Sequence, residues 1–172
     1  VVLSCYAYME QFIEDRTVSF SLENEVVEGL KIPNDAIVEK PLIRIPRTCL
    51  TESMGSEGVL RVKGEKTQFV DLSVVTSDEE AVYIEPNEAA LKIGDTIMQG
   101  TGETATQYTV SDLIPHAGVY VANSSVADFV VIEIQEQNQE YTIVKSGGIT
   151  GLQPFDTIVS DAKNIEEGQS IY

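Results

Sequence analysis

Two similar stretches, residues 58–98 and 118–159, dominate this sequence, and their repetition constrains the fold more than any other feature. A shift of 60 positions (118 minus 58) superposes them, and one inserted residue later the shift becomes 61 (152 minus 91). The matched positions include Gly58 with Gly118, Phe69 with Phe129, Val70 with Val130, Leu72 with Ile132, Leu91 with Leu152 and Asp95 with Asp156. Internal repetition indicates the architecture before any local assignment. We therefore expect two units with the same strand order, and Phe69 and Phe129 buried at equivalent positions.

Each copy has the residue pattern of β-structure. Apolar residues alternate with polar ones at residues 70–74 and again at residues 130–134. Side chains of a strand point to opposite faces in turn, so this pattern predicts a half-buried strand. A short strand follows at residues 81–84 and 141–144, and each copy ends on a turn into a last strand. The predicted fold is all-β, with tandem small antiparallel β-barrel or β-roll modules and an internal repeat at about residues 58–98 and 118–159.

The rest of the chain adds strand and linker signals. Strands are predicted at residues 1–9, 17–22 and 26–32, the last ending at Pro33 because proline cannot donate to a strand ladder. Residues 100–106 (GTGETAT) read as a linker. We therefore expect residues 1–105 to hold the N-terminal strands with the first repeat module, and residues 106–172 to hold the second. Because the sequence starts within a predicted strand, we also expect a segment of a longer protein.

The charge of the chain disfavours two classes of partner. The sequence has 11 basic and 28 acidic residues, for a net charge of −17. Nucleic acids are bound through Lys and Arg, so a nucleic-acid-binding protein is not expected. An anionic membrane surface is disfavoured for the same reason. The two cysteines, Cys5 and Cys49, allow one disulfide, but a chain of this size does not need one, and two unpaired buried cysteines are preferred.

No residue pattern predicts catalysis. His116 is the single histidine, and one histidine cannot build the usual zinc sites. Ser111 is the nearest candidate nucleophile but lacks a Gly-x-Ser-x-Gly elbow. A glycosidase with paired carboxylates is not excluded by residue type, but the chain has no Trp to form a sugar platform. We predict no catalytic, cofactor-binding or metal-binding residues, and a protein that is not an enzyme.

Acidic clusters fall at corresponding turns of the two copies, at residues 78–80 and 136–140. They could form a weak calcium site or simply be solvated hairpin turns. No Asp-x-Asp-x-Asp-Gly loop is present, so solvated turns are preferred. Asn123-Ser124-Ser125 is formally a glycosylation acceptor, a pattern that is short enough to arise often by chance.

Several strings, taken in order, resemble the carboxy-terminal half of HlyD-family efflux adaptor (membrane fusion) proteins of the Gram-positive type. They are residues 15–18 (DRTV), 28–38 (EGLKIPNDAIV), 45–51 (IPRTCLT), 91–97 (LKIGDTI), 118–123 (GVYVAN), 141–144 (YTIV) and 151–159 (GLQPFDTIV). The chain departs from the family pattern at Cys49, where a longer aromatic residue is usual, and at residues 123–126, where a basic residue is usual.

This resemblance implies a non-enzymatic adaptor without a cofactor. Its parent protein would be anchored in the cytoplasmic membrane by an upstream segment, and this chain would be the β-barrel and membrane-proximal region, on the extracytoplasmic face at the cell surface. The implied partners are a membrane transporter (permease) and other adaptor copies, and the isolated segment would be a monomer or a weak dimer. The alternative is a secreted or surface β-module that binds a small ligand or glycan. A transmembrane helix and a coiled-coil hairpin upstream of Val1 would favour the adaptor.

Overall fold

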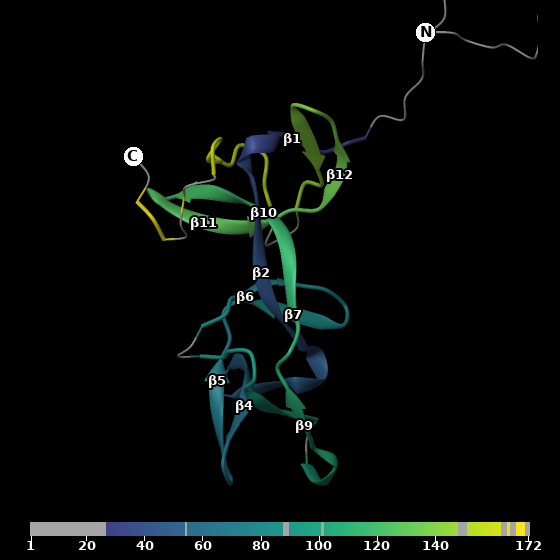
Figure 1. Ribbon diagram of the computed structural model, residues 1–172, viewed down its shortest axis with the longest axis vertical. Helices are drawn as coiled ribbons and strands as arrows, with labels where there is room; N and C mark the ends of the chain where they lie inside the picture. Colours follow the sequence, from purple (N-terminus) through teal and green to yellow (C-terminus); the bar gives the residue numbers. More distant parts are fainter. Residues whose placement is uncertain are drawn as a thin grey trace, which may run out of the picture.

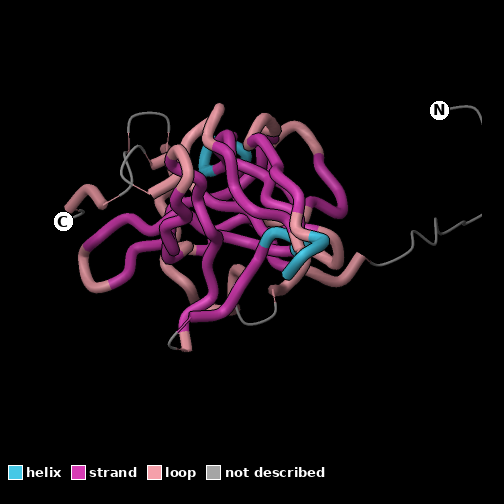
Figure 2. Tube along the Cα trace, turned by 90° about the horizontal axis from the view of Figure 1, so that it is seen from below, coloured by secondary structure: helices cyan, strands magenta, loops and turns pink. Residues whose placement is uncertain are grey.

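The computed structural model describes residues 27–53, 55–87, 90–100, 102–147, 151–162, 165 and 168–170. The predicted strands at residues 1–9 and 17–22, and Cys5, lie outside this part of the chain. Strands make up nearly all of the described regular structure, and the helical segments are single short turns (Figure 2). The predicted all-β class is confirmed.

The described strands all pair antiparallel and form three sheets, in the orders β1-β13-β12, β11-β10-β2-β7-β6 and β3-β4-β8-β9, with β5 paired to β4. The elements in chain order are β1 (Leu30–Pro33), η2 (Asn34–Ala36), β2 (Ile37–Pro46), η3 (Arg47–Cys49), β3 (Leu50–Ser53), β4 (Ser56–Lys63), β5 (Lys66–Asp71), β6 (Val74–Ser77), β7 (Ala81–Ile84), β8 (Thr96–Gln99), η4 (Gly102–Thr104), β9 (Thr106–Thr109), β10 (Leu113–Asn123), β11 (Val126–Val131), β12 (Ile134–Gln137) and β13 (Tyr141–Val144).

The two copies of the repeat build units with the same strand order. β4 to β7 correspond to β10 to β13, and the bridge Arg61↔Ile97 corresponds to Val121↔Ile158. The repeat also extends upstream at a shift of 13 (43 minus 30), since Ile43↔Ile84 in one unit matches Leu30↔Val144 in the other. Each unit therefore starts with a strand, a 3-10 turn and a second strand that lie before its repeated stretch.

One unit is inserted into the other. We call residues 42–112 the inner unit, and residues 27–41 together with 113–170 the outer unit. The start of β2 pairs with β10 of the outer unit, and the end of β2 pairs with β7 of the inner unit. β2 and β10 thus form a two-stranded ribbon that joins the units along the long axis, with β1 and β12 at one end and β4, β5 and β9 at the other (Figure 1). β1 and β2 lie before residue 105, yet they pair with β13 and β10, which lie after it.

Two prolines face each other in the middle of this ribbon. Pro41 and Pro115 are direct partners in the ladder between β2 and β10. The register pairs β7 with β2 only from Ile43 onward, and β11 with β10 only from Gly118 onward. Both prolines therefore stand where their strand has no second neighbour among the described strands, and a residue without a backbone N–H leaves no donor exposed there.

The predicted long strand in each copy turns a corner. The apolar alternation at residues 70–74 runs through the end of β5 at Asp71 and the start of β6 at Val74. The strand leaves the sheet of β4 and joins the sheet of β7, as corner strands do in packed β-structures. The outer unit bends at the same place, between β11 and β12. Beyond the corner the apolar residues of the alternation, Val74 and Ile134, are exposed, so the pattern in the sequence continues past the point where the side chains are buried.

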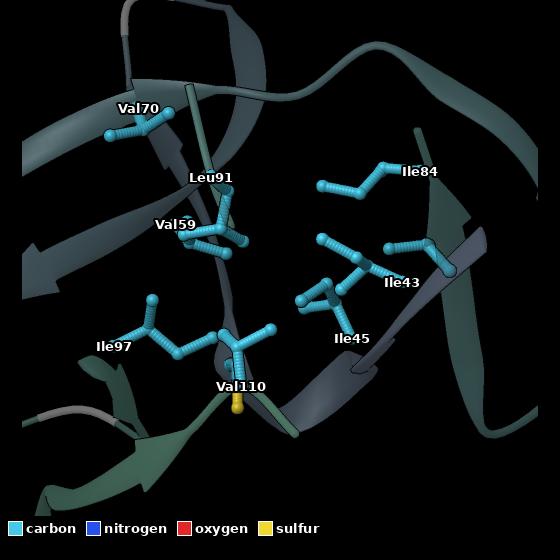
Figure 3. Packing of buried hydrophobic residues seen from close by; sticks show 10 residues of the cluster. Ile43, Ile45, Val59, Val70, Ile84, Leu91, Ile97 and Val110 are labelled. Atoms are coloured by element: carbon cyan, nitrogen blue, oxygen red, sulfur yellow. The ribbon is translucent and has the colours of Figure 1, made fainter. Parts of the chain in front are cut away.

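Each unit has its own apolar core. The inner core joins residues from β2, β4, β5, β7, β8 and the connecting loops (Figure 3). Its members are Ile43, Ile45, Cys49, Val59, Val70, Val82, Ile84, Leu91, Ile97 and Val110. The outer core includes Ile32, Ala36, Val119, Ile132, Val144 and Leu152. A smaller cluster around Leu42, Ala81 and Tyr83 contacts Val131 and so links the two units.

Two predictions need correction. Residues 100–106 are not a linker between modules, because β8 and β9 pair with each other and this segment is the loop of their hairpin. Phe69 and Phe129 do occupy equivalent positions, opposite Leu60 and Tyr120, but only Phe129 is buried and Phe69 is half-buried. Tertiary contacts from the rest of the chain decide this difference, as described below.

Candidate interaction surfaces

The two acidic turns are built on the same hydrogen-bonded frame. In the inner unit, the backbone N–H groups of Glu80 and Ala81 both donate to Asp78 Oδ1 at 2.8 Å. In the outer unit, Asn138 Oδ1 accepts from the N–H groups of Glu140 at 2.9 Å and Tyr141 at 2.8 Å. Asp and Asn side chains favour turns for this reason. One carboxylate of the inner cluster is therefore a structural cap.

A side chain from the preceding 3-10 turn fastens each acidic turn from outside. Arg47 Nε donates to the backbone oxygen of Asp78 at 2.8 Å, and Asn34 Nδ2 donates to that of Asn138 at 2.8 Å. Arg47 and Asn34 are themselves equivalent at the shift of 13 (47 minus 34). The turns are thus held at two points each, and their shape is set before any partner binds.

Asp78 makes one further contact that sets its charge. Tyr83 donates its hydroxyl proton to Asp78 Oδ2 at 2.7 Å. This hydrogen bond, with those from the backbone of Ala81 and Glu80, lowers the pKa of Asp78 below its ordinary value. The same hydrogen bond and partial burial raise the pKa of Tyr83. Asp78 is therefore an ionised acceptor at neutral pH.

The other acidic side chains of the turns are exposed. Glu79, Glu136 and Glu140 are all exposed, while Glu80 Oε2 lies 3.1 Å from Arg44 in an ion pair on the surface. Exposed ion pairs contribute little to stability. These carboxylates are available for contacts, and among the residues that the structure describes no three His, Cys, Asp or Glu side chains gather in a way that could hold a metal ion.

His116 and Ser111 have separate partners. His116 is half-buried, its ring stacks on Tyr83 with 4.4 Å between centroids, and its Nδ1 lies 3.0 Å from the oxygen of Ile114. Ser111 is exposed and donates to Asp112 Oδ1 at 2.9 Å. The β2–β10 ribbon places His116 against Tyr83 of β7 and leaves its side chain partly exposed.

Two further candidates from the sequence, Cys49 and the Asn123-Ser124-Ser125 string, lie in the inner core and in a hairpin turn. Cys49 is buried in the inner core, and burial raises its thiol pKa. Its possible partner, Cys5, lies outside the described residues. Asn123 is exposed at the tip of the β10–β11 hairpin, where Ser124 and Ser125 both have positive φ (50° and 69°). Ser124 and Ser125 form the tight turn of this hairpin.

The edge of the outer unit is open. All four residues of β12 are exposed, and within the described part of the chain β12 pairs with β13 on one side and with no strand on the other. The equivalent strand β6 of the inner unit lies beside β11 of the outer unit. β12 has no such neighbour among the described residues. A strand edge without a partner is a place where another chain can add.

Clefts lie at the corner of each unit. The inner one has a volume of about 460 Å³ and is lined by residues such as Leu72, Val74 and Ile84, with Phe129 reaching in from the outer unit. The outer one has a volume of about 290 Å³ and includes Ile132 and Leu152. Both open beside the bend between two strands, so they follow from the repeated fold.

One exposed apolar residue was missed by sequence reasoning. Phe155 is fully exposed (103%) and has a positive φ of 75°. Its turn closes with the N–H of Asp156 donating to the oxygen of Gln153 at 3.2 Å. The equivalent turn of the inner unit has Gly94 at this position, with φ of 90°. The alignment of Gly94 with Phe155 was readable in the sequence and signals this strained position.

The described part of the chain contains no helix with the length and apolar character needed to cross a membrane. Comparisons with protein-family models, with curated proteins and with solved structures found no match to this chain.

Proposed function

We propose that this chain is an extracytoplasmic adaptor module of an efflux or secretion transporter, of the HlyD-family type, and that it acts through protein–protein contacts without catalysis. Its sequence resemblance supports the link to a transporter. The open edge of β12, with the exposed carboxylates of the adjoining turn, is the structural observation that supports binding through surfaces. The partners would be a permease and further copies of the adaptor, and the parent protein would be anchored in the cytoplasmic membrane.

Weak single contacts suffice for such a module. Several copies placed around one transporter bind by avidity, so that each contact can be modest. We therefore expect binding to the permease only in the full-length, anchored protein, where the local concentration is high.

Co-purification tests this proposal. Full-length protein in detergent should retain the permease encoded beside it, and Glu136→Lys with Glu140→Lys should reduce the retained amount without changing the unfolding temperature. Glu39→Lys is the matched control, because Glu39 is equally exposed but lies on β2, away from the β12–β13 turn. Full-length protein that never retains a permease would count decisively against the proposal, as would a control variant that loses binding to the same degree.

The cleft of about 460 Å³ favours a second candidate, a surface module that binds a small ligand or glycan. Ligand sites are concave and mostly apolar with a few polar groups, and this cleft combines Phe129 with Asp71 and Ser73. A saccharide or metabolite that slows the hydrogen exchange of the backbone amides of Phe129 and Val74 would favour this candidate. An upstream transmembrane helix with a coiled-coil hairpin would favour the adaptor.

A further inference from the structure

A surface that the outer unit covers with its own chain is left open on the inner unit. In the outer unit, the segment after β13 crosses the face of β10 and β11. Ala162, only 2% exposed, packs with Tyr120 and Ala127, and Ile165 packs against the same cluster. This segment therefore completes the core on that side.

The equivalent face of the inner unit has a cavity of about 260 Å³. Its lining is mostly apolar and includes Cys49, Leu50, Leu60, Met98 and Ala105, with Thr67 at one side. For comparison, an apolar cavity of roughly 150 Å³ already takes up benzene. The cavity has room for one aromatic or branched side chain.

Smaller residues explain why this cavity exists. At the shift of 60 (120 minus 60), Leu60 stands where the outer unit has Tyr120. The N–H of Gly100 donates to Thr48 at 2.8 Å, as that of Ala162 donates to Asp35 at 3.2 Å, and Thr48 and Asp35 are equivalent at the shift of 13 (48 minus 35). The inner unit thus has Leu60 and Gly100 where the outer unit has Tyr120 and Ala162, and the missing side-chain volume remains empty.

The strand edge beside the cavity also lacks the cover that its counterpart has. In the outer unit, the N–H of Ala127 donates to Gln169 at 3.0 Å, and its oxygen accepts from Gly168 at 2.9 Å. Thr67 is the counterpart of Ala127, but among the residues that the structure describes β5 pairs only with β4. Because backbone groups of a paired strand alternate in direction, those of Thr67 point away from β4. They are positioned to receive another strand.

The charge beside this edge differs between the units. Lys63 and Lys66, both exposed, flank the β4–β5 turn, where the outer unit has Asn123 and Val126. With Glu65 between them, the turn carries a net charge of +1 (two lysines minus one glutamate) in a chain whose total is −17. A positive turn in an acidic chain favours an acidic segment.

From these observations we infer that the β5 edge and its adjoining cavity form a docking site for an extended, acidic segment of a partner protein. The segment adds to β5 as a further strand, bonded to Thr67, and inserts an aromatic or branched apolar side chain opposite Thr67 into the cavity. In strand addition, backbone hydrogen bonds supply affinity and side-chain pockets supply specificity. A second copy of this chain is the weaker occupant, because its own tail is already bonded to β11. The inference does not depend on the adaptor function.

The chain itself supplies a template for the probe. A labelled peptide with the sequence of residues 164–172 pairs with β5 as residues 168–170 pair with β11, and Gln169 faces the position of Ala127. In fluorescence anisotropy with the intact chain, the peptide with Gln169→Phe should bind at least about tenfold more tightly than the unchanged peptide, and Gln169→Asp should abolish binding.

Variants of the protein separate the features of the site. Thr67→Pro removes the outward N–H of an edge strand, where proline is tolerated, and should weaken the Gln169→Phe peptide about tenfold with an unchanged unfolding temperature. Leu60→Tyr with Ala105→Ile places larger side chains in the lining of the cavity, and should remove the preference for Phe over Gln. Lys63→Asn with Lys66→Val should weaken binding in a salt-dependent way, while Lys92→Gln, at an exposed lysine on another loop, should not.

Three results would overturn the inference. One is that the Gln169→Phe peptide shows no binding at a concentration of about 1 mM, which means a dissociation constant too high for a specific contact. Another is binding that is insensitive to both Thr67→Pro and the cavity-filling pair. The third is sedimentation showing that the wild-type chain forms a dimer that Thr67→Pro disrupts, which would assign the edge to a second copy.

Discussion

Phe155 and Gly94 occupy the same position of the same turn, and only one of them suits it. A left-handed backbone costs a non-glycine residue roughly 1–2 kcal/mol. Glycine gives back part of that through its greater freedom in the unfolded chain. We expect Phe155→Gly to raise the free energy of unfolding by about 0.5–1 kcal/mol in urea titrations. Gly94→Phe, the reverse change in the inner unit, should lower it. A loss of stability in Phe155→Gly would mean that the ring makes contacts that its full exposure argues against.

Asp78 ties the inner acidic turn together, so its ionisation should affect stability. Its pKa is lowered in the folded state, hence its contribution is present above the unfolded value of about 3.9 and is lost as pH falls through the folded pKa. The unfolding temperature of the wild type should therefore fall more steeply below about pH 4 than that of Asp78→Asn. Asp78→Asn keeps the cap, as Asn138 does, and Asp78→Ala removes it. Thermal melts at a series of pH values from acidic to neutral check this. At neutral pH the unfolding temperature should be highest for the wild type, lower for Asp78→Asn and lowest for Asp78→Ala.

At the scale of elements, the strand pairs β4–β5 and β10–β11 are equivalent, but other parts of the chain cover them to different extents. Phe69 and Phe129 both lie against a glycine of the neighbouring strand, since a Cβ on Gly58 would meet the Phe69 ring at 2.6 Å and one on Gly118 would meet the Phe129 ring at 2.3 Å. Phe129 is also packed by Ala162 and Val75. Truncating a buried ring costs about 3–5 kcal/mol. Phe129→Ala should fall in that range, and Phe69→Ala should cost clearly less. Equal losses in urea titrations would show that exposure does not distinguish these positions.

At the scale of the whole molecule, the insertion of the inner unit into the outer unit predicts that the outer unit can fold without the inner one. The core around Ile32, Val119 and Leu152 lies entirely within the outer unit. Asn-Gly favours tight hairpins, so replacing residues 41–115 with Asn-Gly between Lys40 and His116, which are partners in the ladder of β2 and β10, should therefore leave a folded outer unit. Amide NMR dispersion checks this. An unfolded product would mean that Val75 of the inner unit is needed to cover the cluster of Tyr120 and Phe129.

The charge of the whole chain predicts its association. A net charge of −17 makes identical copies repel one another in solution. The isolated segment should be a monomer, or a weak dimer, at micromolar concentration. Light scattering at two salt concentrations checks this, since salt screens the repulsion. A stable ring at low salt would contradict it.

The sequence by itself determined the fold class, the two units and their turns. These are consequences of local spacing: alternation with a period of two makes strands, and residues such as Gly94, Asp95 and Asp78 favour turns wherever they stand. The exposed acidic turns could be predicted for the same reason. The cap formed by Asp78 could not, since Tyr83 and Arg47 reach it only in the folded chain.

Tertiary structure alone decided how the units combine. The pattern of β2 gives no sign that its first half serves the outer unit and its second half the inner unit, because its partners in β10 and β7 are distant in the chain. It also decided that Phe129 is covered while Phe69 is not, and that the cavity beside Thr67 is open. Two repeats with the same strand order have different surroundings, and the burial of their equivalent side chains depends on those surroundings. In the outer unit, Ala162 and Ile165 pack on the cluster of Tyr120 and Phe129. In the inner unit, the chain after β8 forms β9, which pairs with β8 instead.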